Sequence, residues 1–222
     1  MYTPIEMKRS TKFGNNYWTG YSPKVKRTTR FFSDLEYEHW LLVECDPKII
    51  AFCEQPSLKA EYEWEGQLRH SVFDMWVLYK GGEEEFREIK YTSHLEEEHP
   101  HYHQTQKQLN IQKNWCHANK FMHSIQTDNQ IRKNLIHLDN CKILVSFMRF
   151  YEKHHADITS LITAHLKQIK SESIEHLLLR MNRYSEGDVC TAIFAGVYQG
   201  DFSISIEQSP ILKSTVVSPS GS

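Results

Sequence analysis

The sequence lacks several features that would assign it to a familiar class. No apolar run approaches the roughly 20 residues that span a bilayer, and residues 1–10 contain no apolar core of a secretory signal. The five cysteines form no C-x-x-C pair, so we expect reduced thiols, as in a cytosolic protein, and no cysteine zinc site. Neither a G-x-x-x-x-G-K-[ST] phosphate loop nor a G-x-S-x-G nucleophile motif is present.

The net charge of the 222 residues is only -2, but the charges are unevenly distributed, and only residues 153–222 are nearly balanced, with six Lys/Arg and seven acids. Residues 1–33 contain seven Lys/Arg and one acid, residues 34–98 contain six Lys/Arg and seventeen acids, and residues 99–152 are basic again. An acidic block between basic segments is typical of a metal-dependent nuclease, in which carboxylates bind the ion and cations bind phosphate. A solvated acidic surface with a basic tail is the alternative interpretation.

Hydrophobic periodicity predicts an α/β domain preceded by an extended basic arm. Ser33 and Glu36 form the S-x-x-E capping box of a helix that ends before Pro47. The remaining pattern predicts strands over 49–53, 58–64, 68–79, 84–91 and 121–126, a loop over 92–100, and helices over 101–120 and 129–138. Residues 141–151 fit a helix or a buried strand, and we favour the helix.

After residue 155 the pattern changes to short amphipathic helices. Apolar residues at helical spacing predict helices near 158–169, 174–181 and 186–199, and alternation then predicts strands near 202–206 and 211–217. Three helices and a hairpin resemble a winged helix. The predicted domains are therefore a basic arm (1–32), a catalytic domain (33–152), a winged-helix-like domain (153–217) and a disordered tail (218–222).

Three residues of the acidic block are placed to do chemistry together. Asp74 interrupts an apolar strand, where a carboxylate is costly unless it is paired or binds a metal. Glu88 and Lys90 lie on one face of the next strand, and a three-residue loop at Gly81-Gly82 would put Asp74 opposite Glu88. Such carboxylates suit Mg²⁺, for which Mn²⁺ would substitute, and the lysine suits an attacking water. A purely structural role for Asp74 remains open.

Other polar residues have two readings each. Glu36 is a candidate third metal ligand, although the capping box explains it equally well. Lys24, Lys26, Arg27 and Arg30 are candidate contacts to DNA phosphates. His94, His99, His101 and His103 lack typical zinc spacing and predict a polar loop near the active site.

The order of these motifs resembles the TnsA-type transposon endonucleases. Ser33-Asp34-Leu35-Glu36 is similar to the family's S-x-L-E helix, and Asp46-Pro47 through Gln55-Pro56 to its D-P-x-V-x-x-F-x-x-Q-P element. A strand aspartate and then E-V-K follow in the family, and here they read as Asp74 and Glu88-Ile89-Lys90. The family usually has proline before the aspartate, where this chain has Phe73.

The resemblance implies a restriction-endonuclease-like mixed sheet with flanking helices, followed by a small winged-helix-like domain. It implies an enzyme that nicks the 5′ ends of a transposon in double-stranded DNA while a TnsB-type recombinase processes the 3′ ends. It also implies that residues 155–217 engage a TnsC-type AAA+ ATPase regulator. A stand-alone resolvase or repair nuclease of the same fold and a non-catalytic DNA-bound scaffold are the alternatives.

Overall fold

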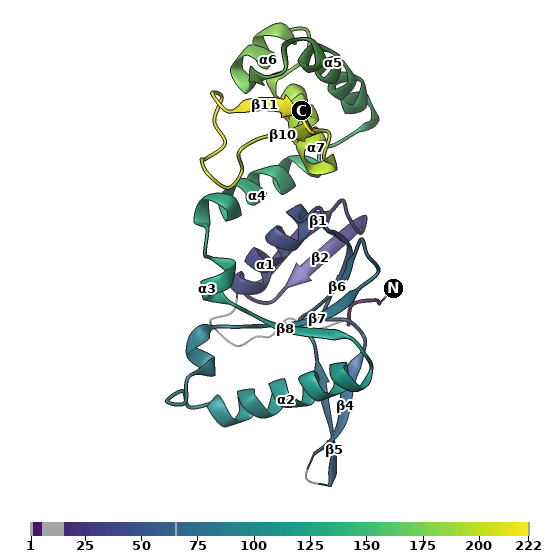
Figure 1. Ribbon diagram of the computed structural model, residues 1–222, viewed down its shortest axis with the longest axis vertical. Helices are drawn as coiled ribbons and strands as arrows, with labels where there is room; N and C mark the ends of the chain where they lie inside the picture. The colour runs from purple at the N-terminus through teal and green to yellow at the C-terminus, as the bar shows by residue number, and fades with distance from the viewer. Residues whose placement is uncertain (1, 6–15, 65, 222) are drawn as a thin grey trace. The chain divides into compact units, whose positions relative to one another are not determined.

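The computed structural model describes residues 2–5, 16–64 and 66–221. The chain divides into two compact units, Met1–Lys133 and Asn134–Ser222. Figure 1 shows the elements of both units. In the described part of the chain, no helix combines the length and the apolar character needed to cross a membrane.

The first unit is built around a mixed four-stranded sheet in the order β3-β6-β7-β8. The strands β7 and β8 run parallel, and the other neighbouring pairs run antiparallel. Their bounds are β3 (Ile49–Glu54), β6 (Met75–Tyr79), β7 (Glu84–Lys90) and β8 (Met122–Thr127). Helix α1 (Asp34–Cys45) and helix α2 (Tyr102–Ala118) lie on opposite sides of this sheet (Figure 1). The expected α/β arrangement of a mixed sheet with flanking helices is confirmed.

The two faces of β7 carry different chemistry because successive side chains of a strand alternate. Arg87 lies on the α1 side, where its Nη1 is 3.4 Å from Nε2 of His39. Glu88 lies on the α2 side, where Gln108 and Gln112 contact it. The candidate catalytic residues therefore belong to the α2 face and to the edge where β3 ends and β6 begins.

The basic arm expected over residues 1–32 differs from the structure. Residues 18–31 form an antiparallel hairpin of β1 (Trp18–Ser22) and β2 (Arg27–Phe31) that packs on α1. Trp18 Nε1 donates to Asp34 at 2.6 Å, and Ser22 donates to Glu44 at 2.7 Å. The alternation of aromatic and small polar residues, hidden among cations, fits a strand pair that a search for long apolar runs overlooks. The expectation for residues 6–15 lies outside the described residues.

Two expected elements are each divided in the structure. The strand expected over 68–79 is β5 (Gln67–Val72) followed by β6, because the chain leaves its pairing with β4 (Lys59–Trp64) and joins a different sheet after Phe73 and Asp74. The helix expected over 129–138 ends early as α3 (Asp128–Ile131), and Asn134 caps a new helix, α4 (Leu135–Met148). The loop expected over 92–100 includes a 3₁₀ helix, η1 (Thr92–Leu95).

The second unit contains four helices and a small sheet among its described residues. Its elements after α4 are α5 (Lys153–Ile169), β9 (Glu172–Ser173), α6 (Ile174–Arg180), α7 (Glu186–Gln199), β10 (Phe202–Ser203) and β11 (Val216–Pro219). The strands lie in the order β10-β11-β9. The tail expected to be disordered from residue 218 contributes instead to β11, and the Ser220 N–H donates to the Asp201 carbonyl at 3.0 Å.

Helix α4 belongs to the second unit, so the chain divides 19 residues before the boundary expected after residue 152. Phe147 packs against Phe194 of α7 with ring centroids 4.9 Å apart. The buried Asn140 donates to the carbonyls of Ile206 and Ser209 at 2.8 Å each and accepts from the Ile211 N–H. These contacts hold α4 and residues 206–211 together.

Candidate active site

Asp74 lies opposite Glu88, because the hairpin loop has three residues rather than two. The Tyr79 N–H donates to the Glu83 carbonyl across residues 80–82, and Met75 pairs with Arg87. The next position along β6 in that register is Asp74, whose Oδ2 accepts the Ile89 N–H at 2.7 Å. Asp74 thus lies directly before β6, between the end of β5 and the start of the four-stranded sheet.

Glu88 is the most enclosed acid of the group, with 1% of its surface exposed. Its Oε1 accepts from Lys90 Nζ at 2.5 Å and from Gln108 Nε2 at 2.7 Å. Its Oε2 accepts from Gln112 Nε2 at 2.6 Å. A buried carboxylate with charge-assisted bonds to both oxygens is held in one orientation.

Glu36 combines a capping role with a place beside the other acids. The Ser33 hydroxyl accepts the Glu36 N–H at 3.2 Å, which confirms the expected N-cap. The Glu36 carboxylate in turn accepts from the Phe32 N–H at 3.1 Å and from the Ser33 hydroxyl at 3.0 Å. In a standard capping box it would accept from the Ser33 amide instead. Gln55, which is buried after β3, donates to Glu36 Oε2 at 2.9 Å.

The charges of the four residues act on one another. Burial raises the pKa of Asp74 well above its ordinary value, and the negative charges of Glu88 and Glu36 add to the shift. Burial likewise raises the pKa of Glu36. Burial acts to lower the pKa of Lys90, but the charges of Glu88 and Asp74 outweigh it and the pKa is raised. Three acids with one lysine leave an excess of negative charge that a cation would neutralise.

The donor set fits Mg²⁺ in its chemistry, because this ion prefers carboxylate oxygens and keeps several waters. Asp74 and Glu88 lie on adjacent strands, and Glu36 approaches from α1. Their oxygens do not form a group within 4.8 Å of one another among the described residues. Both oxygens of Glu88 also accept side-chain hydrogen bonds. An ion here would therefore be held through few carboxylate oxygens together with water.

Sequence reasoning missed the two glutamines that hold Glu88. Gln108 and Gln112 are four residues apart and so share one helix face. The i, i+4 spacing is visible in the sequence, but polar residues on a polar helix do not indicate that they face a buried acid.

Phe73 stands where the resembled family usually has proline. It is fully buried, and its ring centroid is 4.6 Å from that of Phe86.

Two of the four expected DNA-binding cations make contacts within the protein. Lys24 Nζ donates to the carbonyls of Val43 and Asp46 at 2.8 Å each, and burial lowers its pKa. Arg27 forms a two-bond ion pair with Glu54, at 2.5 and 2.6 Å. Lys26 and Arg30 are exposed.

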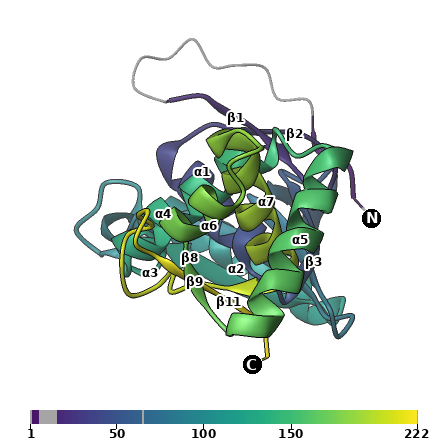
Figure 2. The same ribbon diagram turned by 90° about the horizontal axis from the view of Figure 1, so that it is seen from above.

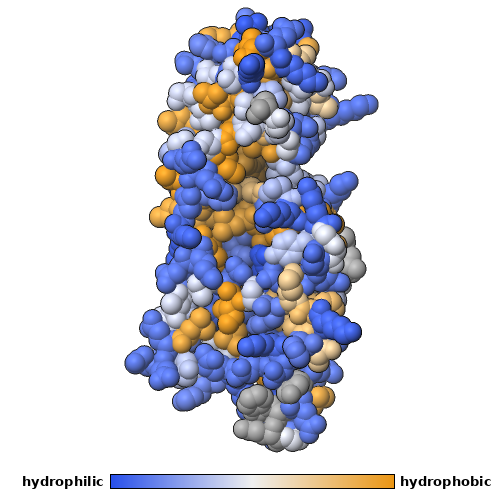
Figure 3. All heavy atoms as spheres, viewed as in Figure 1, coloured by the Kyte–Doolittle hydropathy of each residue, from blue (hydrophilic) through white to orange (hydrophobic). Residues whose placement is uncertain are grey.

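A groove of about 500 Å³ runs between β5 and α2 and reaches the candidate site at Gln108. Arg69 and Lys107 line it, together with His70 and Gln104. Arg69 Nε is buried and has no hydrogen-bond partner in the described part of the chain. Hydrophilic side chains predominate on the visible surface over α2 (Figure 3). The groove therefore offers positive charge directly beside Gln108, which contacts Glu88.

The histidine cluster lies partly in the expected loop, which holds His94 and His99, whereas His101 is the N-cap of α2 and His103 lies in its first turn. The rings of His94 and His99 are 4.4 Å apart, and those of His99 and His101 are 5.7 Å apart. Burial lowers the pKa of His94, and the charges of His99 and Lys90 lower it further.

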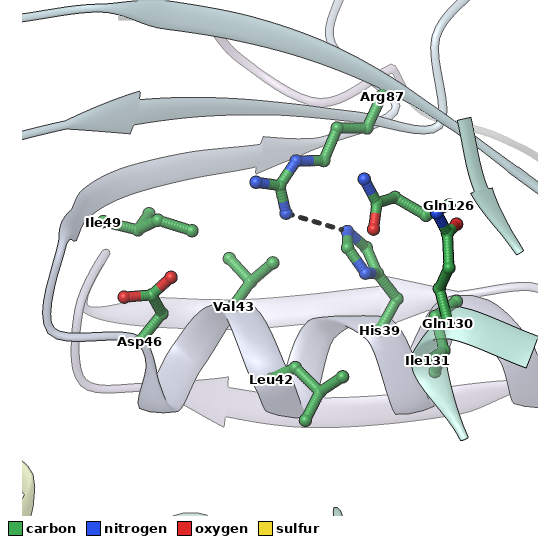
Figure 4. Close-up of a pocket in the computed structure, with 9 residues that line it drawn as sticks. All are labelled: His39, Leu42, Val43, Asp46, Ile49, Arg87, Gln126, Gln130 and Ile131. Carbon is green, nitrogen blue, oxygen red and sulfur yellow. Dashed lines mark hydrogen bonds between the residues drawn. The ribbon is translucent and has the colours of Figure 1, made fainter. Parts of the chain in front are cut away.

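The opposite face of β7 contains a smaller cavity of about 110 Å³ beside α1 (Figure 4). Arg87 and His39 point toward each other in it, and burial together with Arg87 holds the pKa of His39 well below its usual value. Arg87 is also bonded to Glu85 and Tyr79, at 2.8 and 2.6 Å. A neutral imidazole and a paired guanidinium make this a structural network.

Residues 46–128 match the family model described as TnsA-like endonuclease N terminal. The match contains Asp74, Glu88 and Lys90, together with α2 and its two glutamines, and the resemblance found in the sequence is confirmed over this segment. Glu36 and the second unit lie outside it. No curated protein matches the chain. Residues 46–128 are thus a TnsA-like endonuclease domain, and their family implies a nuclease that acts on DNA.

Proposed function

We propose that this chain is the Mg²⁺-dependent DNA endonuclease subunit of a heteromeric transposase. It nicks the 5′ ends of the transposon while a TnsB-type recombinase processes the 3′ ends. The observation that carries the proposal is the convergence of Asp74, Glu88 and Lys90 inside the segment that matches the endonuclease family.

The residues of the chain have separate tasks in this reaction. Asp74, Glu88 and Glu36 would hold the ion, which would supply Lewis acidity at the scissile phosphate. Lys90, kept cationic by Glu88 and Asp74, orients the attacking water and stabilises the charge that develops on the phosphate. Gln108 and Gln112 keep Glu88 in its orientation.

The groove between β5 and α2 supplies a path for the DNA backbone. Arg69 and Lys107 line a space that adjoins Gln108, so phosphates bound there lie beside the carboxylates. Lys26 and Arg30 remain candidates for flanking phosphates because they are exposed. Lys24 and Arg27 would have to give up their internal bonds to take part.

The second unit is proposed to be a winged-helix-like domain that binds the TnsC-type ATPase regulator. Its elements from α5 follow the order helix, strand, helix, helix, strand, strand, with β11 between the other two strands. The third helix, α7, contains no lysine or arginine, whereas a helix that reads DNA normally carries them. A protein partner fits this surface better than base contacts do.

A nicking assay on DNA that contains a transposon end tests the proposal. In Mg²⁺ or Mn²⁺ we expect the full chain to nick 5′ ends with its recombinase present and to be nearly silent alone. Asp74→Asn should remove the nicking, while the control Asp157→Asn, at an exposed position of α5 in the second unit, should keep it. Equal cleavage without the recombinase would indicate a stand-alone nuclease, and binding without cleavage under any condition would indicate a scaffold.

A further inference from the structure

A second group of metal-ligating side chains lies in the second unit. His154 and His155 occupy the first turn of α5, and Asp188 occupies the first turn of α7. These two helices pack side by side (Figures 1 and 2). One ligand atom from each of the three residues lies within 4.8 Å of the other two.

The distances within the group suit a shared ion better than direct hydrogen bonds. Nε2 of His154 is 3.6 Å from Oδ1 of Asp188, and Nε2 of His155 is 3.4 Å from the same oxygen. A good N–H···O bond is about 2.7–3.2 Å long. Two ligands that each lie about 2.0–2.1 Å from a tetrahedral zinc are separated by roughly 3.3 Å. The observed spacing is close to that second value.

The surroundings keep the three ligands pointed at one position. The Ser185 hydroxyl donates to Oδ2 of Asp188 at 2.7 Å, which leaves Oδ1 toward the two imidazoles. His155 is 3% exposed. Its Nδ1 accepts the Glu152 N–H at 2.9 Å and is 3.3 Å from the Glu152 carbonyl. That carbonyl would accept the Nδ1 proton once Nε2 binds a metal, an arrangement typical of metal-bound histidine.

We propose that His154, His155 and Asp188 bind a zinc ion that ties the start of α5 to the start of α7. Water completes the tetrahedron, since His154 is half exposed. Two helix N-termini carry partial positive charge toward the ion, and His155 gives up its bond from the Glu152 amide. Both effects make the affinity moderate, so zinc acts as a reversible brace of the second unit rather than as a requirement for its folding.

Zinc titration of the full chain tests this site. The protein is stripped with a chelator and titrated with Zn²⁺ against a chromophoric competitor, in excess Mg²⁺ to occupy the carboxylates of the first unit. We expect His154→Ala to bind one zinc fewer than the wild type, or to bind it at least about tenfold more weakly. Zinc should also raise the thermal unfolding midpoint of the wild type but not of this variant.

The controls distinguish zinc binding at this three-residue site from nonspecific zinc binding by other histidines. His154 is exposed, so its truncation should leave the circular dichroism spectrum unchanged, and Asp188→Asn removes the same ion by another ligand. His176→Gln is the matched control, because His176 pairs with Glu172 at 3.1 Å on the same unit and belongs to no three-ligand group among the described residues. Equal zinc stoichiometry and affinity in the wild type, His154→Ala and Asp188→Asn would overturn the proposal.

Discussion

Asp74 lies where burial and two neighbouring carboxylates oppose its ionisation. Because its pKa is raised in the folded chain, the folded state holds a proton that the unfolded state releases. Stability from this group is complete below the ordinary pKa of about 3.9 and is lost as pH rises toward the folded pKa. An ion bound at the site would offset that loss, so the cost is felt most without metal.

We therefore expect Asp74→Asn to abolish nicking and, in chelator, to make the chain more stable at neutral pH than the wild type. Asparagine keeps an oxygen for the Ile89 amide and removes the charge. Urea unfolding of both proteins between pH 4 and 8 measures the difference. If the free energies of unfolding of the two proteins changed in parallel with pH, ionisation of Asp74 would carry no cost in stability.

Glu36→Gln separates the capping role of this residue from its proposed role as a ligand. Glutamine can accept from the Phe32 amide and donate to the Ser33 hydroxyl, so we expect the free energy of unfolding to change by less than about 1 kcal/mol. Nicking should fall strongly, since a neutral amide is a weaker ligand for Mg²⁺. Cleavage at the wild-type rate would return Glu36 to a purely structural role.

The sequence predicts Asp74 and Glu88 as neighbours, but it does not predict the glutamines that hold Glu88 in place. The positions of Asp74 and Glu88 follow from loop length and strand period, which are local properties. Gln108 and Gln112 come from a helix 20 or more residues away, and nothing in their own surroundings shows that a buried acid faces them. Contacts of this kind depend on tertiary packing, and a single sequence does not encode them in a readable pattern.

The β1–β2 hairpin replaces the expected arm, and its cations divide into two kinds. Arg27 pairs with Glu54, whose side chain is 3% exposed, and removing one partner of a buried pair leaves an uncompensated charge. We expect Arg27→Ala to lower the free energy of unfolding by about 2–4 kcal/mol. Arg30→Ala, on the same strand and exposed, should change it by less than about 0.5 kcal/mol. Chemical denaturation of the two variants makes the comparison, and equal losses would refute it.

The groove between β5 and α2 gives a second prediction at this scale. Neutralising Arg69 and Lys107 together should weaken DNA binding for all sequences and reduce the slope of log K against log salt by about one for each lost phosphate contact. Fluorescence anisotropy at several salt concentrations measures this slope. The exposed Lys167 on α5 serves as the matched control, and an unchanged slope in the double variant would remove the groove from the DNA path.

Elements with strong local signals were predicted correctly, and the misplaced ones have tertiary causes. The Ser33 cap and the periodicity of α5 and α7 suffice to locate their helices. The division of residues 67–79 between two sheets is not visible in the sequence, since both halves have strand character. The hairpin at 18–31 is not predicted because its cations are interpreted as an extended arm that contacts DNA phosphates, whereas Lys24 and Arg27 bind groups within the protein.

At the scale of the whole molecule, the boundary between the two units determines which fragment of the chain can fold independently. The buried face of α4, formed by Leu138, Cys141, Leu144, Val145 and Met148, packs within the second unit. A fragment that ends after Tyr151 would keep this helix and lose α7, its partner. A fragment that ends after Lys133 would keep the carboxylates, Lys90 and both glutamines without an exposed apolar helix.

We expect residues 1–133 to unfold cooperatively as a monomer and residues 1–151 to aggregate or to bind a hydrophobic dye, because about 25 cal/mol is lost for each Å² of apolar surface left in water. Size-exclusion chromatography and dye fluorescence compare the two fragments. If the longer fragment is instead the monomeric one, α4 is stabilised by the first unit and the division lies nearer residue 152.

The fragment of residues 1–133 should also retain recombinase-dependent nicking of isolated transposon ends. It should lose binding to the ATPase regulator, since by our proposal the second unit carries that contact. If this fragment still binds the regulator, the regulator docks on the endonuclease domain itself.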